Sequence, residues 1–411
     1  MRILKYVIIG NSAAGIGAVE GIRQIDKSGE ITIITSEPHH TYSRPLISYL
    51  LKGTVTEQTM KYRGDSFYTD NNCTLSEGVV SSVDAEKKQV ILSNGCTVPY
   101  DKLLAAAGSS AFVPPIEGLD AVEDKFTFMS LDDAKSLDNA IDENKRVLIV
   151  GAGLIGLKCA EGILDRVSHV TVVDQSPRIL SSILDKTGAS MVQNHLENKG
   201  IEFRLSSGVK KLKTNTAVLE DDSEIEFDIL VLAVGVRPNT SLLEGIAEID
   251  RGIVINEKSE TTMLDIYAAG DCTQTHDISS GQNKIMALLP NAYMQGECAG
   301  INMAGGDKAF CKAIPMNAIG FFGLNLITAG NYDGDVYAED ESGSYKRLFY
   351  KDNKLCGYIL IGNVKKAGIY TNLIREQTPL DTIDFALICK KPGLMAFTTK
   401  DRMVKLGGGA R

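Results

Sequence analysis

The sequence predicts an α/β protein with two three-layer domains, each built around strand–helix–strand units, and a small α+β domain toward its C-terminal end. Residues 5–38 and 146–177 resemble each other. Each stretch begins with a short β-branched apolar run, continues through a glycine-rich turn into a helical pattern, and ends in a second apolar strand. From residue 311 onward, apolar and polar residues alternate as in an antiparallel sheet. A unit that occurs twice indicates two domains of similar architecture.

Length and composition agree with this architecture. A chain of 411 residues has room for about two to three domains. The formal net charge of −9 argues against nucleic acid as a partner. No apolar run approaches the roughly 18 residues that a membrane span needs, and the first apolar run is too short for a signal peptide. We therefore expect a cytoplasmic protein without a membrane span.

The cysteines and histidines are spread along the chain rather than clustered. The eight cysteines contain no C-x-x-C pair, so most of them should be reduced, small core residues. The five histidines form no group with cysteine at the spacing of zinc or iron–sulfur ligands. We therefore expect no bound metal.

The glycine-rich turn of the second repeat has the spacing of a dinucleotide-binding loop. Gly151 permits a tight turn, Gly153 lets the backbone approach a pyrophosphate, and Gly156 lets the helix pack close to the sheet. The pyrophosphate would lie at the helix N-terminus, where unpaired N–H groups and the helix dipole favour an anion. Asp174, at the end of the second strand, is placed to bind a ribose. A carboxylate there favours NADH over NADPH, although the nearby Arg178 leaves NADPH open.

The turn of the first repeat follows the same plan with one change. The corresponding positions are Gly10, Ser12 and Gly15, with Glu37 as the acidic residue. Ser12 replaces the middle glycine, so this motif is weaker taken alone. Two such turns in full strand–helix–strand context, each with its own acidic residue, are much stronger evidence. They predict two Rossmann-like domains that bind two dinucleotides.

Five further segments make a family resemblance specific. They are TYSRPLISYLLKG (41–53), YDKLLAAAGSSAFVPPIEG (100–118), DILVLAVGVRPNTSLL (228–243), SETTMLDIYAAGDCTQ (259–274) and LLPNAYMQGECAGINMAGG (288–306). With these segments in this order, the chain resembles the FAD-dependent pyridine nucleotide-disulfide oxidoreductase superfamily. Within it, the chain is similar to the branch of NAD(P)H:rubredoxin and ferredoxin reductases.

The resemblance implies that the first repeat binds FAD and the second binds NADH. Asp271 would bind the ribityl chain of FAD, and Arg44 would lie against the flavin phosphates or the ring edge. The helix that begins near Pro290 would point toward the flavin pyrimidine ring. The positions expected to contact FAD are Gly10, Ser12, Ala13, Ala14, Gly15, Glu37, Arg44, Pro45, Val80, Ala107, Gly108, Gly270, Asp271, Pro290 and Asn291. The positions expected to contact NADH are Gly151, Gly153, Leu154, Ile155, Gly156, Asp174, Val234 and Gly235.

The resemblance also implies an order of domains. The FAD-binding domain would be discontinuous, at residues 1–115 and 245–310, with the NAD-binding domain inserted at 116–244. The small α+β domain at 311–389 would cover the flavin site and support an interface, such as that of a homodimer. Residues 390–411 form a basic tail. Such a tail is typical of a solvated, partly disordered segment. The alternative is that it contacts a redox partner or a neighbouring subunit, because rubredoxins and ferredoxins are usually acidic.

Missing residues narrow the reaction that the resemblance implies. Disulfide reductases of the superfamily need a redox cysteine pair beside the flavin and a C-terminal histidine, but the first cysteine is Cys73 and no histidine follows His276. Coenzyme A-disulfide reductases and water-forming NADH oxidases use one cysteine in the flavin-proximal loop, and none occurs near Ser43–Ser48. What remains is hydride transfer from NADH to flavin N5. Single electrons would then pass to rubredoxin, ferredoxin or an iron–sulfur subunit of a larger complex.

Two departures separate the chain from ferredoxin reductases. Tyr49 stands where they usually have lysine, and Lys158 stands where they place a glutamate near the nicotinamide. We therefore expect a lysine–glutamate pair to be missing at the flavin, with Lys158 either beside the cofactors or on the surface of its helix. This pattern favours a rubredoxin reductase or a dedicated subunit. Two other functions stay open, an H2O2-forming NADH oxidase and a non-catalytic flavin-binding assembly subunit.

Overall fold

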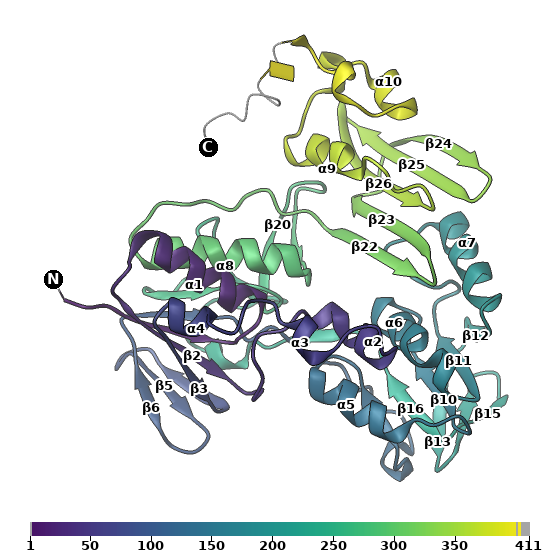
Figure 1. Cartoon of the computed structure of the whole chain (residues 1–411), viewed down its shortest axis with the longest axis horizontal. Coiled ribbons are helices and arrows are strands. Elements are labelled where there is room, and N and C mark those ends of the chain that lie inside the picture. Colours follow the sequence, from purple (N-terminus) through teal and green to yellow (C-terminus); the bar gives the residue numbers. More distant parts are fainter. Residues whose placement is uncertain (1, 400–401, 404–411) are drawn as a thin grey trace. The chain divides into compact units, whose positions relative to one another are not determined.

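The computed structural model of the chain describes residues 2–399 and 402–403. These residues form two compact units (Figure 1). Unit 1 comprises Met1–Thr275 and Lys284–Phe310, and unit 2 comprises His276–Asn283 and Cys311–Arg411. Unit 1 contains both predicted repeats, and unit 2 contains the predicted antiparallel sheet. The finer boundaries predicted inside unit 1 remain a prediction.

The first repeat forms the centre of a five-stranded parallel sheet. Strand β1 (Lys5–Ile9) pairs in parallel with β2 (Glu30–Thr35) on one side and with β7 (Lys102–Ala105) on the other. Four of the five residues of β1 are buried, as expected of a parallel strand that is covered on both faces. Strands β3 (Cys73–Glu77) and β19 (Ile266–Ala268) complete the order β19-β7-β1-β2-β3.

Helices α1 (Ala13–Ile25) and α8 (Leu289–Met303) lie side by side next to this sheet (Figure 1). Their backbones touch because glycines face each other. A Cβ atom built on Gly296 would lie 1.9 Å from the carbonyl oxygen of Ala14, and one on Gly17 would lie 2.3 Å from that of Tyr293. Gly21 and Gly300 are equally crowded by the opposite helix. The two helices can therefore approach this closely only while these positions carry no side chain.

The second repeat forms a second five-stranded parallel sheet in unit 1. Strand β10 (Arg146–Val150) pairs with β11 (His169–Asp174) and with β16 (Ile229–Leu232). Strands β12 (Ile201–Leu205) and β9 (Lys125–Thr127) extend the sheet to the order β12-β11-β10-β16-β9. The helices of this part are α5 (Leu131–Ala140), α6 (Leu154–Ile163) and α7 (Lys186–Glu197).

Each parallel sheet is accompanied by a small antiparallel sheet of three strands. The first is β4 (Val80–Asp84), β5 (Gln89–Leu92) and β6 (Thr97–Pro99), and the second is β13 (Val209–Lys213), β14 (Thr216–Leu219) and β15 (Glu224–Glu226). The internal repeat therefore extends beyond the predicted units. The remaining strands of unit 1 are short: β8 (Ser109–Ala111), β17 (Val236–Pro238) and β18 (Ile253–Val254). Strands β20 (Thr273–Asp277) and β21 (Gln282–Ile285) each have residues assigned to both units, because the chain passes from unit 1 to unit 2 within β20 and returns within β21.

Unit 2 is an antiparallel sheet with helices at its C-terminal end. Its strands have the order β22-β23-β26-β25-β24, with bounds Met316–Phe321, Leu324–Gly330, Lys354–Ile361, Ser344–Lys351 and Asp335–Glu341. Helix α9 (Ala367–Arg375) packs Tyr370 and Leu373 into the same core as Tyr358 of the sheet. Helix α10 (Phe385–Lys390) follows. The predicted α/β class, with two Rossmann-like domains and a small α+β domain, is confirmed.

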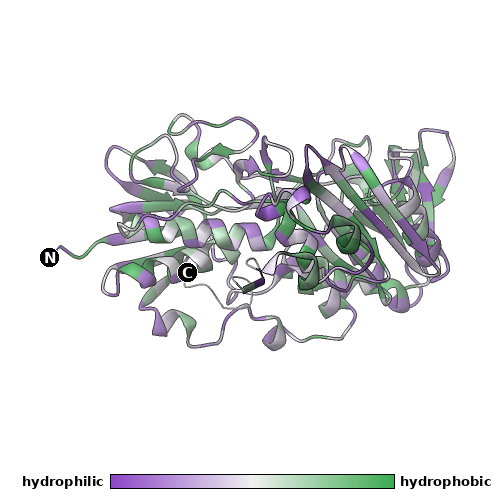
Figure 2. Cartoon of the chain, turned by 90° about the horizontal axis from the view of Figure 1, so that it is seen from above, coloured by the Kyte–Doolittle hydropathy of each residue, from purple (hydrophilic) through white to green (hydrophobic). Residues whose placement is uncertain are grey.

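Hydrophobic and hydrophilic residues are interleaved along the helices and strands (Figure 2). Within the described ranges, no helix is long and apolar enough to cross a membrane.

Candidate functional site

The two glycine-rich turns have nearly the same geometry. Gly10 and Gly151 both have a φ of +117°, a conformation that residues with a side chain rarely adopt. A Cβ on Gly15 would lie 2.1 Å from the carbonyl oxygen of Gly10, and one on Gly156 would lie 2.0 Å from that of Gly151. Both turns therefore need glycine at the first position for the turn and at the third position for close packing.

The helices after these turns begin without a side-chain cap. Ser12 precedes α1 with an extended backbone, and its hydroxyl makes no capping hydrogen bond. Gly153 precedes α6 in a similar conformation, and a Cβ there would meet no atom within 4 Å. The first backbone N–H groups of each helix have no capping acceptor from these residues. Both N-termini therefore fit a bound phosphate.

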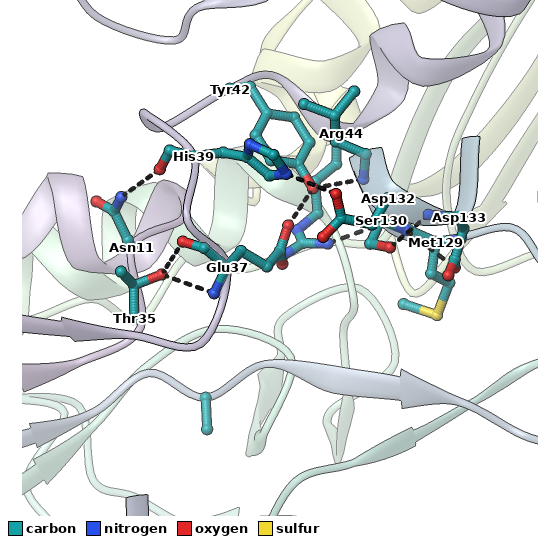
Figure 3. Close-up of polar contacts among 12 residues, drawn as sticks. Asn11, Thr35, Glu37, His39, Tyr42, Arg44, Met129, Ser130, Asp132 and Asp133 are labelled. Atoms are coloured by element: carbon teal, nitrogen blue, oxygen red, sulfur yellow. Dashed lines mark hydrogen bonds and ion pairs between the residues drawn. The ribbon is translucent and has the colours of Figure 1, made fainter. Parts of the chain in front are cut away.

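Glu37 lies at the carboxyl end of β2, as predicted for the acidic residue of the first repeat. Tyr42 donates a hydrogen bond of 2.6 Å to one carboxylate oxygen, and Arg44 pairs with the other (Figure 3). Arg44 also donates to the carbonyl oxygen of Met129 at 3.1 Å. Burial alone would lower the pKa of the Arg44 guanidinium, but Tyr42 and Glu37 raise it overall. Arg44 thus pairs with Glu37, the carboxylate predicted to bind a ribose, and the predicted contact of Arg44 with the flavin phosphates or ring edge stays a prediction.

A buried hydroxyl near the first turn fits a bound cofactor. Thr41 is 1% exposed, and its Oγ1 atom has no hydrogen-bond partner among the described residues. A buried hydroxyl without a hydrogen-bond partner lowers the free energy of unfolding by about 1–3 kcal/mol. The Thr41 backbone N–H donates to Tyr68 Oη at 3.1 Å, and Tyr68 donates to Asn11 Oδ1 at 2.9 Å. Because Asn11 belongs to the first glycine turn, Thr41 lies close to the proposed phosphate site.

Asp271 lies just after β19, beside the same turn. Ser109 donates a hydrogen bond of 3.2 Å to its carboxylate. Burial raises the pKa of this carboxyl group, while Ser109 and the charge of Arg44 oppose the shift. The preceding Gly270 has a φ of +83°, and its Cβ would lie 3.2 Å from that of Ala14. The fold therefore brings the second FAD segment against the first.

The other positions predicted to contact FAD lie on several segments of unit 1. Pro290 is in the first turn of α8, where proline is well tolerated, and Asn291 is buried. The carbonyl oxygens of Ala107 and Gly108 both accept hydrogen bonds from Asn239. Ala13 begins α1, Pro45 lies in a short 3-10 helix, and Val80 begins β4. Their predicted contacts with the cofactor remain predictions.

Asp174 is fixed at the second turn by two backbone hydrogen bonds. Its oxygens accept from the N–H groups of Ala152 and Ser176, each at 2.7 Å. Arg178 instead donates to the carbonyl oxygens of Leu184 and Ser181, so its guanidinium is tied to its own loop. This geometry favours NADH over NADPH. Leu154 and Ile155 begin α6, whereas Val234 and Gly235 follow β16.

Tyr49 and Lys158 occupy the two positions of the lysine–glutamate pair that we expected to be missing, and Lys158 belongs to a different group of ion pairs. Lys158 pairs with Glu161, one turn further along α6, and Lys52 Nζ lies 3.5 Å from the same carboxylate. Lys158 is not a surface residue, since its side chain is only 17% exposed and lies 4.3 Å from the centre of the Tyr49 ring. The i, i+3 spacing of Lys158 and Glu161 was visible in the sequence. The approach of Lys52 depends on the tertiary fold.

Half of the cysteines are core residues, rather than most of them as expected. All eight cysteines are free, and four of them are buried. Burial raises the pKa of the Cys73, Cys272 and Cys389 thiols to about 11, so these groups are protonated and unreactive near neutral pH. In the described part of the chain, no group of three or more histidine, cysteine or acidic residues could hold a metal ion.

Comparison with known families gives two consecutive matches. Residues 4–296 match the family described as pyridine nucleotide-disulphide oxidoreductase. Residues 315–378 match the rubredoxin NAD+ reductase C-terminal domain.

Curated relatives match over most of the chain. The chain is 32% identical to the NADH-dependent phenylglyoxylate dehydrogenase subunit epsilon of Aromatoleum evansii, covering 92% of each protein. It is 30% identical to a rubredoxin-NAD(+) reductase of Ectopseudomonas oleovorans, covering 90% of this chain and 99% of the relative. It is 33% identical to an NADH oxidase of Methanocaldococcus jannaschii, covering 75% of this chain and 71% of the relative. The names of all three relatives contain the nicotinamide cofactor.

A solved structure has the same fold. The putidaredoxin reductase in its covalent complex with putidaredoxin matches with a TM-score of 0.87 and 20% identity, covering 99% of both chains.

Proposed function

The chain belongs to the pyridine nucleotide-disulphide oxidoreductase family, and we propose that it oxidises NADH and passes the electrons to a redox protein. The superfamily and the cofactors FAD and NADH that the sequence predicted are confirmed by this membership. Bound FAD would accept hydride from NADH and release the electrons one at a time. The protein supplies position and polarity for this chemistry.

The residues that would hold the two cofactors form two matching sets. For FAD, the N-terminus of α1 would bind the pyrophosphate, Glu37 the adenosine ribose and Asp271 the ribityl chain. For NADH, the N-terminus of α6 would bind the pyrophosphate and Asp174 the ribose. Arg44 would hold the Glu37 carboxylate in its orientation through their ion pair. No side chain is assigned a proton-transfer role, because hydride transfer between the two cofactors needs none.

One observation carries the proposal: the flavin-proximal loop, residues 41–53, contains no cysteine. A disulfide reductase or a thiol-dependent oxidase would need one there as an electron relay. The other thiols are either remote in sequence or protonated by burial. Electrons would therefore leave the flavin directly, toward rubredoxin, ferredoxin or an iron–sulfur subunit of a larger complex. The names of two relatives, a rubredoxin reductase and a dehydrogenase subunit, support these acceptors.

The proposal can be tested by anaerobic mixing with NADH. We expect the visible flavin absorbance to bleach within seconds and to recover when rubredoxin or ferredoxin is added. If NADH does not bleach the flavin, the protein is a non-catalytic flavin-binding subunit. If the reduced flavin ignores both proteins but makes stoichiometric peroxide with oxygen, it is an H2O2-forming NADH oxidase, a candidate that the NADH oxidase relative supports. Untagged co-purification would then identify the physiological partner.

Thiol modification should leave the activity intact. Iodoacetamide under native conditions should label Cys96 and Cys311, which are exposed, and leave the four buried cysteines unlabelled. Because no thiol relays electrons, the labelled protein should reduce an artificial dye with NADH at the original rate. Mass spectrometry of the labelled protein, paired with the dye assay, checks both statements. Loss of activity in proportion to labelling would contradict the proposed route.

The basic segment after residue 389 offers a second test of the partner. Lys390 and Lys391 are exposed, but Ala396 and Phe397 are buried in the core of unit 2. The predicted tail therefore contributes to the fold before residue 400, and the remainder lies largely outside the described residues. Charge reversal is consequently a cleaner test than truncation.

Lys390→Glu with Lys391→Glu should weaken docking of an acidic protein acceptor. We expect the KM for rubredoxin or ferredoxin to rise about fivefold at low salt, and less at high salt, because screening removes surface electrostatics. NADH-dependent dye reduction should not change. Equal KM values for the variant and the original protein would exclude these lysines from the docking surface. We also propose a cytoplasmic location, which the eight free thiols support.

A further inference from the structure

The loop that follows β2 is tied to the start of α5 by three side chains (Figure 3). The three contacts are those of His39 with Asp132, Tyr42 with Leu131 and Arg44 with Met129. Both segments belong to unit 1, but the contact at Leu131 joins residues that are 89 positions apart in the sequence. The loop of the first repeat is therefore held by the segment that begins α5.

The Tyr42 hydroxyl is the group in this set that joins α5 to Glu37. It belongs to a side chain that is only 9% exposed, and it donates a hydrogen bond of 2.6 Å to Glu37. Its oxygen accepts a hydrogen bond of 2.9 Å from the backbone N–H of Leu131. Because a phenol has a single proton to donate, this proton is directed to Glu37. Burial raises the pKa of the Tyr42 hydroxyl, and Glu37 adds to the shift while Arg44 opposes it, so the group remains a donor near neutral pH.

The Glu37 carboxylate is held on both of its oxygens. Tyr42 donates to one oxygen and Arg44 to the other. Each of these two donors is bound in turn by the backbone of residues 129–131. The carboxylate can still accept further hydrogen bonds, because each oxygen has two lone pairs and the side chain is 24% exposed. The start of α5 therefore sets the orientation of a carboxylate that is open to a ligand.

The same loop lies beside the first glycine turn. Asn11 of that turn donates a hydrogen bond of 3.4 Å to the carbonyl oxygen of His39. In the proposed function, the turn binds the FAD pyrophosphate and Glu37 binds the adenosine ribose. We propose that Tyr42 is a positioning residue that orients the Glu37 carboxylate toward the ribose hydroxyls and couples their binding to the hydrogen bond at Leu131. This inference rests on the proposed function, and it adds a coupling that hydride transfer does not itself require.

Two consequences follow from these hydrogen bonds. Without the Tyr42 hydroxyl, Glu37 loses one of its two donors and can turn away from the ribose, so the ribose hydroxyls should contribute less to FAD binding. A hydrogen bond to a charged group of this kind changes an equilibrium constant about tenfold or more. Coupling between two sites is also reciprocal. Ribose hydroxyls that fix Glu37 should therefore fix Tyr42 as well and protect the Leu131 amide.

Release of cofactor from the flavin-loaded protein tests the first consequence. The probes are FAD and its 2′,3′-dideoxyadenosine analogue, which lacks the hydroxyls that Glu37 would bind. Ultrafiltration at intervals after dilution gives the rate at which each is released. For Tyr42→Phe, we expect FAD to leave about tenfold faster and the analogue to leave at a rate within about twofold of the original. The inference is overturned if both cofactors leave faster by the same factor, as a purely structural role requires, or if FAD release is unchanged.

Tyr293→Phe is the matched control. Tyr293 also donates its hydroxyl to a carboxylate, that of Glu20, which pairs with Arg63. None of these three residues is a predicted cofactor contact, so this variant should leave both release rates within about twofold of the original. Should Tyr293→Phe accelerate FAD release as much as Tyr42→Phe does, the effect would not depend on Glu37 and the inference would be wrong.

Glu37→Gln tests the proposed ribose contact by itself. It should accelerate the release of FAD about tenfold and leave the release of the analogue within about twofold. If it affects both cofactors alike, the ribose contact assigned to Glu37 in the proposed function fails, and the inference fails with it. If Glu37→Gln discriminates between the cofactors and Tyr42→Phe does not, the inference alone is overturned.

Hydrogen exchange at the Leu131 amide tests the second consequence without any variant. In the original protein, this amide should exchange about fivefold more slowly with bound FAD than with the bound analogue. Equal exchange rates would overturn the coupling. This measurement also decides the matter if Tyr42→Phe does not retain flavin.

Discussion

Replacement of Gly296 by valine should abolish the soluble, flavin-bound protein. A Cβ at this position would lie 1.9 Å from the carbonyl oxygen of Ala14, which is backbone and cannot rotate away. Overpacking typically costs about 1–3 kcal/mol and occasionally more, and a clash with backbone along a helix–helix contact belongs to the upper end of this range or above it. Folded proteins are stable by only about 5–15 kcal/mol. Because α1 begins at the first glycine turn, the displacement would also distort the proposed FAD site.

The effect can be measured as soluble yield, flavin content and melting temperature. Gly368→Val is the matched control, since Gly368 also lies in a helix but a Cβ there would meet no atom within 4 Å. We expect the control to keep its flavin and to lose little stability, in keeping with the modest helix penalty of valine. A Gly296→Val protein that melts like the control and keeps its flavin would show that the helices can separate without cost.

The internal repeat is the part of the fold that the sequence predicted best. Each of its two turns needs particular backbone angles at particular positions, and such local needs appear in the sequence as glycines at a fixed spacing. Gly10 and Gly151 both need a positive φ that only glycine adopts readily. The middle position has no such need, because Ser12 and Gly153 both have extended backbones with negative φ. This difference explains why serine can replace glycine in the first turn without loss of the motif.

Contacts between distant segments were not predictable in the same way. Gly17 and Gly21 match Gly296 and Gly300 in spacing, but nothing in the sequence says that these two helices meet. The ion pair of Arg44 with Glu37, for example, was not predicted from the sequence. Such contacts form only when the tertiary fold brings together segments that are far apart in the sequence.

The ion pairs around Glu161 on α6 also depend on a contact between distant segments. A comparison of single positions suggested that an ion pair had been lost, because Lys158 occupies the place of a glutamate. The fold gives Lys158 a different partner, Glu161 from the next turn, and Lys52, which follows helix α2 (Ile47–Leu51), approaches the same carboxylate. A buried charge needs a partner, and the partner can come from any position that reaches it. The charge balance at a site therefore depends on all the residues that surround it rather than on the residue at one position.

Replacement of Asp174 by alanine together with Gln175 by arginine should reverse the preference from NADH to NADPH. The carboxylate of Asp174 is fixed by the N–H groups of Ala152 and Ser176, and its remaining lone pairs can accept from the ribose hydroxyls. Loss of charge-assisted hydrogen bonds of this kind costs about 1.5–3 kcal/mol, so kcat/KM for NADH should fall by about 10- to 100-fold. Gln175 is exposed, so an arginine can extend there and pair with the 2′-phosphate of NADPH.

The two kcat/KM values, measured with the same dye acceptor, separate this mechanism from a general loss of folding. A damaged turn would lower both values, whereas the proposed ribose contact predicts that one falls and the other rises. Arg178→Ala is the useful control, because its guanidinium is held by the carbonyl oxygens of Ser181 and Leu184. It should change neither value by more than about twofold. If Arg178→Ala instead removed residual NADPH activity, Arg178 would have to leave its loop when the nucleotide binds. The preference would then depend on a movement of residues 176–184 rather than on the fixed carboxylate of Asp174.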